Sequence, residues 1–282
     1  MDNFVCREFC SPLLEDHHKS STTHLAVIAH QDDAEIVGYS GIQASFQRTD
    51  SWFSSITLTN GSGASRGGRY QNASNDALSL IRQHEQEKAA LLGEYAFCQQ
   101  WLCSSQTLKD QRNLAVQQLT NELDQIRPST IYTHNPFDKH GTHITVLTIV
   151  LDALKSVIQT NPSYQPKVYG VEVWGSLDWL PNQFRIELDC SPMPNLEQAL
   201  IGLYDSQIDG NKGYDTAVLG RRQANATFSD SHTEDQARSV NLALDLSPIT
   251  QGIISLNDLT DEILKTHFEE SKLRIQSIVS SS

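Results

Sequence analysis

The sequence is poor in cysteine, in basic residues and in long apolar runs, and each shortage narrows the classes of protein that it can encode. Its five cysteines are scattered without a Cys-x-x-Cys pair, which argues against a disulfide framework or a thiolate zinc site and for reduced thiols in a cytoplasmic protein. Lysine and arginine number 21 against 34 acidic residues, so the net charge of −13 disfavours nucleic acid or an anionic membrane as the main partner. Because no N-terminal apolar segment and no uncharged run of about 18 residues is present, we expect neither export nor a membrane span.

A phosphate-cradling nucleotide loop is absent as well. Seven of the ten residues in 60–69 are Gly, Ser or Asn, which is typical of a surface loop, but their spacing is not that of a P-loop. Arg66 in this loop either holds an anionic or hydroxyl-rich substrate or is a solvated loop residue. The composition of the loop leaves both alternatives open.

Strands alternate with helices through the first 175 residues of the 282-residue chain. Short apolar runs predict the strands, and apolar positions at helical spacing predict the helices between them. This alternation indicates an α/β fold whose mostly parallel sheet is covered by helices on both faces. The expected strands are 25–29, 52–59, 95–98, 129–134 and 167–174, and the expected helices between them are 34–46, 75–92, 109–126 and 144–158.

The remaining segments are predicted to complete one domain. Residues 1–22 show no periodic apolar pattern, so we expect an irregular N-terminal leader, followed by a single domain over residues 23–282. An edge strand is expected at 184–188. Helices are expected at 196–204, 211–225 and 258–279, and the last of these could pack between subunits of a homo-oligomer.

Residues 30–35 read His-Gln-Asp-Asp-Ala-Glu and follow the strand expected at 25–29. In open α/β sheets ligands bind beyond the carboxyl ends of parallel strands, which is where this cluster falls. One imidazole and three carboxylates suit half of a metal site. In the structural alternative, Asp32 or Asp33 only caps the helix that begins near Ala34.

A second cluster, residues 134–143, contains three histidines and Asp138 at the end of the strand expected at 129–134. His140 and His143 are spaced i,i+3 at the start of the next helix, so they can face the same side. A helix N-terminus disfavours protonated imidazole and keeps both rings available as ligands or donors. One such histidine is easily explained as a core or capping residue, but three together favour the second half of a metal site.

If the two strands are neighbours, the two clusters meet in one crevice. Two imidazoles and one carboxylate are a common set of protein ligands for catalytic zinc, and the absence of cysteine favours a hydrolytic over a structural site. Zinc lowers the pKa of its bound water from about 15.7 toward 7, and an adjacent carboxylate can then take the proton. We therefore expect one carboxylate to bind the metal and the other to act as a base. Non-haem iron(II) uses the same ligand types, so another divalent metal stays an alternative.

The two clusters resemble the signatures of a known enzyme family. Residues 30–36 resemble the His-Pro-Asp-Asp motif of the LmbE-like (PIG-L) family of zinc-dependent sugar N-deacetylases, and Asp138-x-His140-x-x-His143 resembles its Asp-x-His-Pro-Asp-His motif. Segments 59–67 and 82–93 are also similar to family segments, and the likeness continues to residue 174 and weakly through 204–207 and 222–225. The resemblance implies a Rossmann-like three-layer α/β/α sandwich that holds no dinucleotide.

The family pattern also implies roles for the clustered residues. It implies one zinc ion per chain, held by His30, Asp33 and His143. Asp32 becomes the general base on the metal-bound water, and His140 polarises the amide carbonyl or stabilises the tetrahedral oxyanion. The implied reaction is removal of an acetyl group from an N-acetylated amino sugar, such as an N-acetylglucosamine conjugate.

The resemblance further implies residues that support the substrate. Arg66 and Arg82 become substrate-binding or loop-anchoring residues. Arg82 and Glu85 are spaced i,i+3, so a surface ion pair between them is the structural alternative.

Two positions depart from the family pattern. Gln31 replaces the usual proline, which should loosen the turn while leaving the ligands in register. Thr142 replaces an aspartate of the second motif, and Asp138 is expected to compensate as a hydrogen-bonding partner of a histidine. The loss of that aspartate keeps two alternatives open: a hydratase or lyase acting on an unsaturated acidic substrate, and a catalytically impaired relative that binds sugar.

Overall fold

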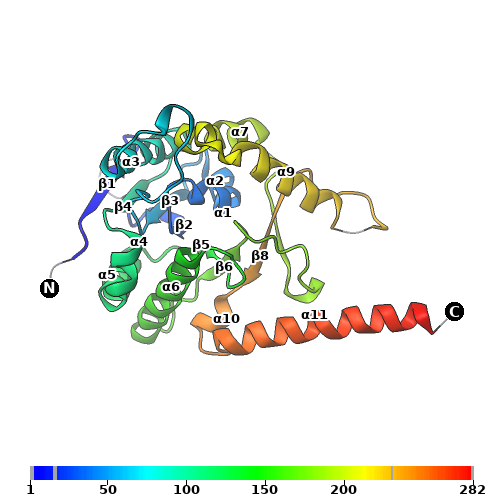
Figure 1. Ribbon diagram of the computed structural model, residues 1–282. Coiled ribbons are helices and arrows are strands. Elements are labelled where there is room, and N and C mark those ends of the chain that lie inside the picture. Colours follow the sequence, from blue (N-terminus) through cyan, green and yellow to red (C-terminus); the bar gives the residue numbers. More distant parts are fainter. Residues whose placement is uncertain (1–2, 15–17, 230, 281–282) are drawn as a thin grey trace.

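The computed structural model describes residues 3–14, 18–229 and 231–280, which are built around one eight-stranded sheet (Figure 1). The strands are β1 (Cys6–Cys10), β2 (Thr22–Ile28), β3 (Trp52–Thr57), β4 (Phe97–Trp101), β5 (Thr130–His134), β6 (Lys167–Val171), β7 (Ile186–Asp189) and β8 (Val240–Asp245). Their order in the sheet is β1-β4-β3-β2-β5-β6-β8-β7. β4, β3, β2, β5 and β6 run parallel, whereas β1 pairs antiparallel with β4, and β8 pairs antiparallel with β6 and β7. The mostly parallel α/β sheet expected from the sequence is confirmed.

Helices cover both faces of this sheet (Figure 1). They are α1 (Asp33–Val37), α2 (Tyr39–Ser45), α3 (Asn75–Leu92), α4 (Ser105–Asp110), α5 (Arg112–Ile126), α6 (Gly141–Thr160), α7 (Pro194–Ile201), α8 (Asp205–Gln207), α9 (Tyr214–Thr227), α10 (Ser247–Thr250) and α11 (Leu256–Val279), with short helical turns η1 (Gly68–Tyr70), η2 (Asn182–Phe184) and η3 (Ile208–Lys212). α5 and α6 pack together on one face, and α1, α2, α3 and α7 contribute to the core on the other. The result is the three-layer sandwich that the sequence predicts.

Strand β2 divides the two cores. Successive side chains of a strand point to opposite faces of the sheet. Leu25 and Val27 join the core under α5 and α6, whereas Ala26 and Ile28 join the core under α1 and α2. All four are fully buried, which explains why β2 reads as a continuous apolar run rather than an alternating one.

The topology places both polar clusters at one point of the sheet. β2 and β5 are hydrogen-bonded parallel neighbours, with Ala26 opposite Tyr132. The chain winds from β2 through β3 to β4 on one side, and from β5 to β6 on the other, so the order reverses between β2 and β5. This reversal is the topological switch point at which open α/β sheets bind ligands. The expectation that neighbouring strands carry the two clusters is therefore confirmed.

The N-terminal segment differs from the expected irregular leader. Residues Cys6–Cys10 form β1, which extends the sheet by pairing with β4. The preceding Phe4 is nearly buried and stacks on Trp101, with ring centroids 5.2 Å apart. The prediction for residues 1–22 was wrong over this strand because an edge strand obtains its hydrogen bonds and its packing from β4 and needs no apolar period of its own. Residues 1–2 and 15–17 of that segment lie outside the described part.

Two further elements differ from the prediction. The helix expected over 34–46 is broken into α1 and α2 at Gly38, where a Cβ atom would lie 2.7 Å from the ring of Phe53. The sequence analysis also missed β8, which lies between β6 and β7 and is buried over most of its length. Both features depend on tertiary neighbours that local spacing does not reveal.

Two long helices, α6 and α11, differ in how much of their surface is buried. Among the described residues, α6 alone is long and apolar enough to cross a membrane, but 61% of its apolar window is buried inside the protein, as in a core helix. α11 packs through Leu259 and Ile263 near its start, and its C-terminal half extends away from the body of the molecule (Figure 1).

Candidate metal centre and its cavity

The turn after β2 presents the first cluster. Asp32 adopts a left-handed backbone conformation with φ at 94°, which is uncommon for a residue other than glycine and is found at functional sites. Asp32 makes no capping hydrogen bond to α1, and Asp33 Oδ2 instead accepts the backbone N–H of His30 at 2.9 Å. The capping alternative is therefore wrong, and both carboxylates are available for other contacts.

Three side-chain atoms from the two clusters form a tight triangle. Asp33 Oδ2 lies 3.2 Å from His30 Nδ1 and 3.4 Å from His143 Nε2, and the two imidazole nitrogens lie 3.2 Å apart. Ligands bound tetrahedrally to zinc at the usual bond lengths are separated by about 3.3–3.4 Å. The triangle has the spacing and the donor types of a three-ligand zinc site.

Hydrogen bonds fix which nitrogen of each ring is free. His143 Nδ1 lies 3.2 Å from Asp138 Oδ2, so that nitrogen carries the proton and leaves the lone pair of Nε2 for the triangle. His140 Nδ1 accepts the N–H of Thr142 at 3.3 Å, which puts the ring's proton on Nε2. The lone pair of His143 Nε2 thus faces the triangle, and His140 carries a donor N–H at Nε2.

His134 is a buried histidine of the second cluster for which the family pattern implies no role. Its Nε2 accepts the backbone N–H of Ala29 at 2.9 Å, and its ring stacks on His143 with centroids 3.8 Å apart. It also lies close enough to Asp33 and His143 to count geometrically in a metal-binding group. Because its Nε2 lone pair is already engaged, we assign it to supporting the ring of His143 and the end of β2.

Buried negative charge around the triangle is stabilised by a nearby positive charge. Burial by itself would lower the pKa of His143, but the carboxylates of Asp33 and Asp138 raise it to about 10. Burial would raise the pKa of Asp33, but the neighbouring imidazoles of His143, His30 and His134 hold it well below its ordinary value. Two ionised carboxylates buried around His143 need positive charge, which a divalent metal can supply as well as a proton can.

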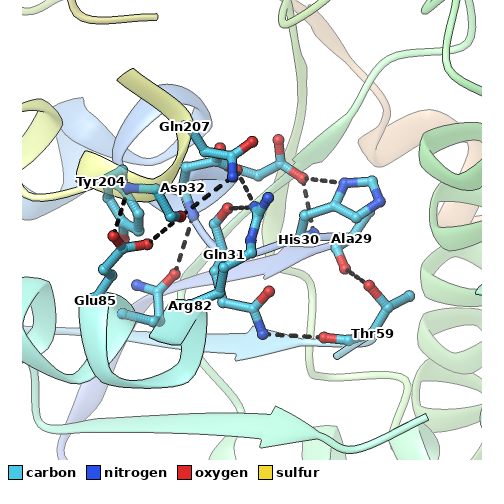
Figure 2. A network of polar contacts seen from close by, with 12 residues as sticks. Ala29, His30, Gln31, Asp32, Thr59, Arg82, Glu85, Tyr204 and Gln207 are labelled. Atoms are coloured by element: carbon cyan, nitrogen blue, oxygen red, sulfur yellow. Dashed lines mark hydrogen bonds and ion pairs between the residues drawn. The ribbon is translucent and has the colours of Figure 1, made fainter. Parts of the chain in front are cut away.

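Asp32 lies beside the triangle and contacts a buried arginine. Burial raises the pKa of Asp32 to about 8, and the nearby guanidinium of Arg82 partly offsets this rise. Arg82 Nη2 is 3.2 Å from Asp32 Oδ1 and also donates to the carbonyl oxygen of Gln31 (Figure 2). A carboxyl group whose pKa lies near neutrality suits proton transfer.

A cavity of about 640 Å³ opens over this centre. His30, Asp32, Asp33 and His140 lie on its floor, and its rim comes from the Gly/Ser-rich loop, from the segment after β6 and from α9. Its volume suits a ligand of one or two sugar rings.

Part of the chain matches the sequence model of a known protein family. The family described as GlcNAc-PI de-N-acetylase (PIG-L) matches residues 25–154, which include both clusters. Residues 25–154 therefore resemble the PIG-L family in sequence. This confirms the LmbE-like resemblance, and no curated protein matches the chain in sequence.

Solved structures share the fold of this chain at low sequence identity. N,N'-diacetylchitobiose deacetylase from Pyrococcus horikoshii is 14% identical with a TM-score of 0.64, covering 86% of this chain and 90% of its own. The 4-carboxy-2-hydroxymuconate hydratase from Pseudomonas putida is 15% identical with a TM-score of 0.58, covering 80% and 96%. A zinc-inhibited form of teicoplanin deacetylase is 14% identical with a TM-score of 0.55, covering 78% and 96%. Both deacetylases and the hydratase have this fold, so the fold does not choose between their reactions.

Gln31, one of the two departures from the PIG-L pattern, does not loosen the turn as expected. Its side chain is fully buried, and its amide donates to the carbonyl oxygen of Thr59 at 3.1 Å (Figure 2). The same amide donates to the side-chain oxygen of Gln100 at 3.0 Å. These bonds tie the turn to the end of β3 and to β4. Gln31 thus replaces the rigidity of proline with hydrogen bonds.

The arginines of the matched segment differ from each other in position. Arg66 donates to the carbonyl oxygens of Ser62 and Ala73 within its own region and is not among the residues that line the cavity, which favours loop anchoring over substrate binding. Arg82 does line the cavity, and its contact with a substrate stays a prediction. The surface ion pair with Glu85 is not formed, because Arg82 is buried on Asp32.

Two buried charges were not anticipated from the sequence. Arg222 on α9 donates to the carbonyl oxygens of Glu35 and Ile36 at 2.9 and 2.8 Å and pairs with Glu197. The carboxylate of Glu35 accepts hydrogen bonds from Tyr95 and Tyr204 at 2.6 and 2.5 Å, so it is a core residue and not a metal ligand. The spacing of Glu35 from His30 gave no signal that would separate it from the two aspartates.

Proposed function

We propose that this protein is a metal-dependent hydrolase that removes the acetyl group from an N-acetylated amino sugar or its conjugate. The observation that carries the proposal is the triangle of His30 Nδ1, Asp33 Oδ2 and His143 Nε2, with edges of 3.2–3.4 Å beneath a sugar-sized cavity. The PIG-L match over residues 25–154 supports the same reaction class.

The proposed metal is one zinc ion per chain, held by His30, Asp33 and His143. Two neutral imidazoles and one carboxylate are a common protein ligand set for a catalytic zinc, although other divalent metals accept the same ligands. When bound, the metal would supply Lewis-acid chemistry, which acidifies the attacking water and polarises the amide carbonyl.

The residues around the triangle would then move the protons. Asp32 takes one proton from water as the water oxygen forms a bond to the acetyl carbon, and Arg82 holds the Asp32 carboxylate in place for this step. The Nε2–H of His140 donates a hydrogen bond to the oxyanion that develops on the acetyl group. The C–N bond then breaks, the proton held by Asp32 passes to the leaving nitrogen, and acetate and a free amine result.

Asp138 and Thr142 would share the work of the aspartate that the second motif lacks. Asp138 Oδ1 accepts the backbone N–H of His140 at 2.8 Å, and its Oδ2 lies next to His143. Thr142 fixes the ring of His140 through its backbone N–H instead of a carboxylate. His140 is therefore neutral in this chain, since burial lowers its pKa to about 4, and it acts as a hydrogen-bond donor rather than as an imidazolium.

The wider assignments are proposals of the same kind. Because β1 completes the sheet, we propose that the N-terminal segment belongs to the same domain as residues 23–282. The five free cysteines and a small amino-sugar substrate fit a cytoplasmic enzyme. Self-association through α11 stays a prediction.

Acetate release from N-acetylglucosamine conjugates by the zinc-loaded protein tests the proposed function. We expect Asp32→Ala to lower turnover by about 10²–10⁴-fold while keeping the metal, because a general base contributes this much. Asp178→Ala, which changes an exposed carboxylate outside this cavity, is the matched control and should behave as wild type.

Either of two results would reject the proposal. Acetate release that survives in Asp32→Ala would remove the base from the mechanism. No release from any conjugate, with one zinc bound per chain, would favour the hydratase alternative or a relative that only binds sugar.

A further inference from the structure

One wall of the cavity is formed by η3 and α9, and we call it the outer wall. It is basic, although the chain as a whole is acidic. Asp32 and Asp33 are the acidic residues of the cavity lining, and both lie at the metal centre. The basic residues of the lining are Arg82, Lys212 and Arg221, of which Arg82 is already paired with Asp32. The outer wall therefore carries two positive charges in a protein of net charge −13.

Lys212 is the more accessible of these two cations. Arg221 donates to the carbonyl oxygen of Val173 and is partly buried. The ammonium of Lys212 lies 5.2 Å from the ring centroid of Trp174, and no carboxylate within the described ranges is in ion-pair contact with it. The acidic residues nearest to it along η3 and α8, Asp209 and Asp205, are both bound by Arg69 at 3.2 and 2.7 Å.

The backbone holds Lys212 in this position. Lys212 ends η3, and its neighbours Asn211 and Gly213 have φ of 66° and 48°. η3 packs against the Gly/Ser-rich loop so closely that a Cβ atom on Gly68 would lie 2.4 Å from the carbonyl oxygen of Asp209. A left-handed residue such as Asn211 costs conformational energy and persists where the surroundings fix it. The backbone of Lys212 is thus held in place as part of the rim.

Trp174 connects this rim to the reacting end of the cavity. Its ring centroid lies 6.3 Å from that of His140, and its backbone N–H donates to Asp138 Oδ2 at 3.2 Å. Asp138 also bonds His143, so the ring and the metal centre share one anchor. A sugar whose acetyl group reaches His140 would place its next substituent over Trp174 and beside Lys212.

We propose that Lys212 and Trp174 form a subsite for an anionic group, a carboxylate or a phosphate, on the part of the substrate attached to the amino sugar. This inference rests on the proposed deacetylase function. Lys212 and Trp174 lie outside residues 25–154. The subsite is therefore a feature of this chain beyond the segment that matches the family. The ammonium offers charge-assisted hydrogen bonds to the anion, and the indole ring covers the adjoining apolar atoms.

Three conjugates test the subsite and separate its two ligand sources. They are methyl N-acetylglucosaminide, its carboxymethyl counterpart and N-acetylglucosamine 1-phosphate, which carry no charge, a carboxylate and a phosphate. We expect wild type to prefer at least one anionic conjugate over the methyl glycoside in kcat/KM. Lys212→Met should reduce that preference by about tenfold, mainly through KM, and Lys212→Glu should reverse it. Lys265→Met, on the exposed face of α11, is the control and should keep the preference.

The outcomes distinguish the subsite from the proposed function. An anionic preference that is unchanged in Lys212→Met, or no preference in wild type, would overturn the subsite while leaving the deacetylase intact. If no conjugate releases acetate, the deacetylase fails, and calorimetric titration of the same conjugates into Asp32→Ala still decides the subsite. Tighter binding of an anionic conjugate that is lost in the Asp32→Ala/Lys212→Met double variant supports it, and equal binding of all three overturns it.

Discussion

The inner and outer walls of the cavity are built in different ways. The inner wall consists of turns at the carboxyl ends of β2 and β5, where His143 and Asp33 are almost fully buried and hydrogen-bonded on several sides. The outer wall consists of η3 and the start of α9, where Lys212 is exposed and the backbone is left-handed at two positions. The family match covers the first wall and ends before the second.

Helix α3 connects the two walls. Arg82 reaches from it to the turn at Asp32 (Figure 2), and Glu85, one turn later, accepts two hydrogen bonds from Ser206 at 2.7 and 2.6 Å. One helix face therefore positions Asp32 and the segment that leads into η3. The residues proposed for the chemistry are held by buried contacts, whereas the residues proposed for substrate preference lie on an exposed rim held at a few points.

The largest effect is expected from removing a ligand of the inner wall. His143→Ala should reduce bound metal from about one ion per chain to nearly none and lower activity by more than about 10²-fold, because both other ligands then lose their partner. Metal content by mass spectrometry and acetate release measure this. His267→Ala, which alters a ring that packs against Trp179 and does not line the cavity, is the control. Equal metal content in His143→Ala and wild type would refute the ligand assignment.

The next effect concerns the buried link from α9 to α1. Arg222→Met keeps an apolar stem but leaves Glu197 and two backbone carbonyl groups without their donor, so the free energy of unfolding should fall by about 3–5 kcal/mol. Urea denaturation measures it. Arg48→Met, which removes an exposed pair with Asp50, should unfold like wild type. A comparable loss in both variants would mean that burial of Arg222 contributes no special stability.

A smaller effect is expected from the partner of a ligand. Asp138→Asn keeps the shape of the side chain but weakens its hydrogen bond to His143, so metal affinity should fall by about 10–100-fold. Competition with a chelator of known affinity measures the change. Asp124→Asn, in an exposed pair with Arg127, serves as the matched control. Unchanged metal affinity in Asp138→Asn would show that Asp138 does not compensate for the motif aspartate that Thr142 replaces.

The contrast between the walls also explains what the sequence could predict. The inner wall was predictable because its residues follow strongly apolar strands, and parallel strands bring their carboxyl ends together. His30 and His143 are 113 residues apart, yet two local motifs placed them in one crevice. The expected irregularity of residues 1–22 and the absence of β8 from the prediction show the limit of this approach, because an edge strand and an antiparallel insertion depend on their neighbours.

Long-range polar contacts could not be predicted from local sequence patterns for a different reason. The partners of Arg222 on α1 lie 186 and 187 residues away, and nothing in their spacing indicates an interaction. Arg66 and Arg82 looked alike as basic residues near the motifs, but only the fold separates the loop anchor from the residue that holds Asp32. Lys212 gave no signal at all, because an exposed lysine in a polar segment is common.

The smallest effect is expected where the two loops of the rim meet. Arg69 bridges Asp205 and Asp209, but its side chain is 66% exposed, so Arg69→Ala should leave the unfolding midpoint unchanged. Locally, the loss of both contacts should let η3 open more often, so that amides of residues 205–213 exchange with solvent faster by a factor below about ten, while those of β2 keep their rates. Hydrogen exchange followed by mass spectrometry measures this, with Arg127→Ala as the exposed-pair control. Faster exchange in β2 as well would show that the rim and the metal centre open together, and unchanged exchange at 205–213 would show that glycine packing alone fixes Lys212.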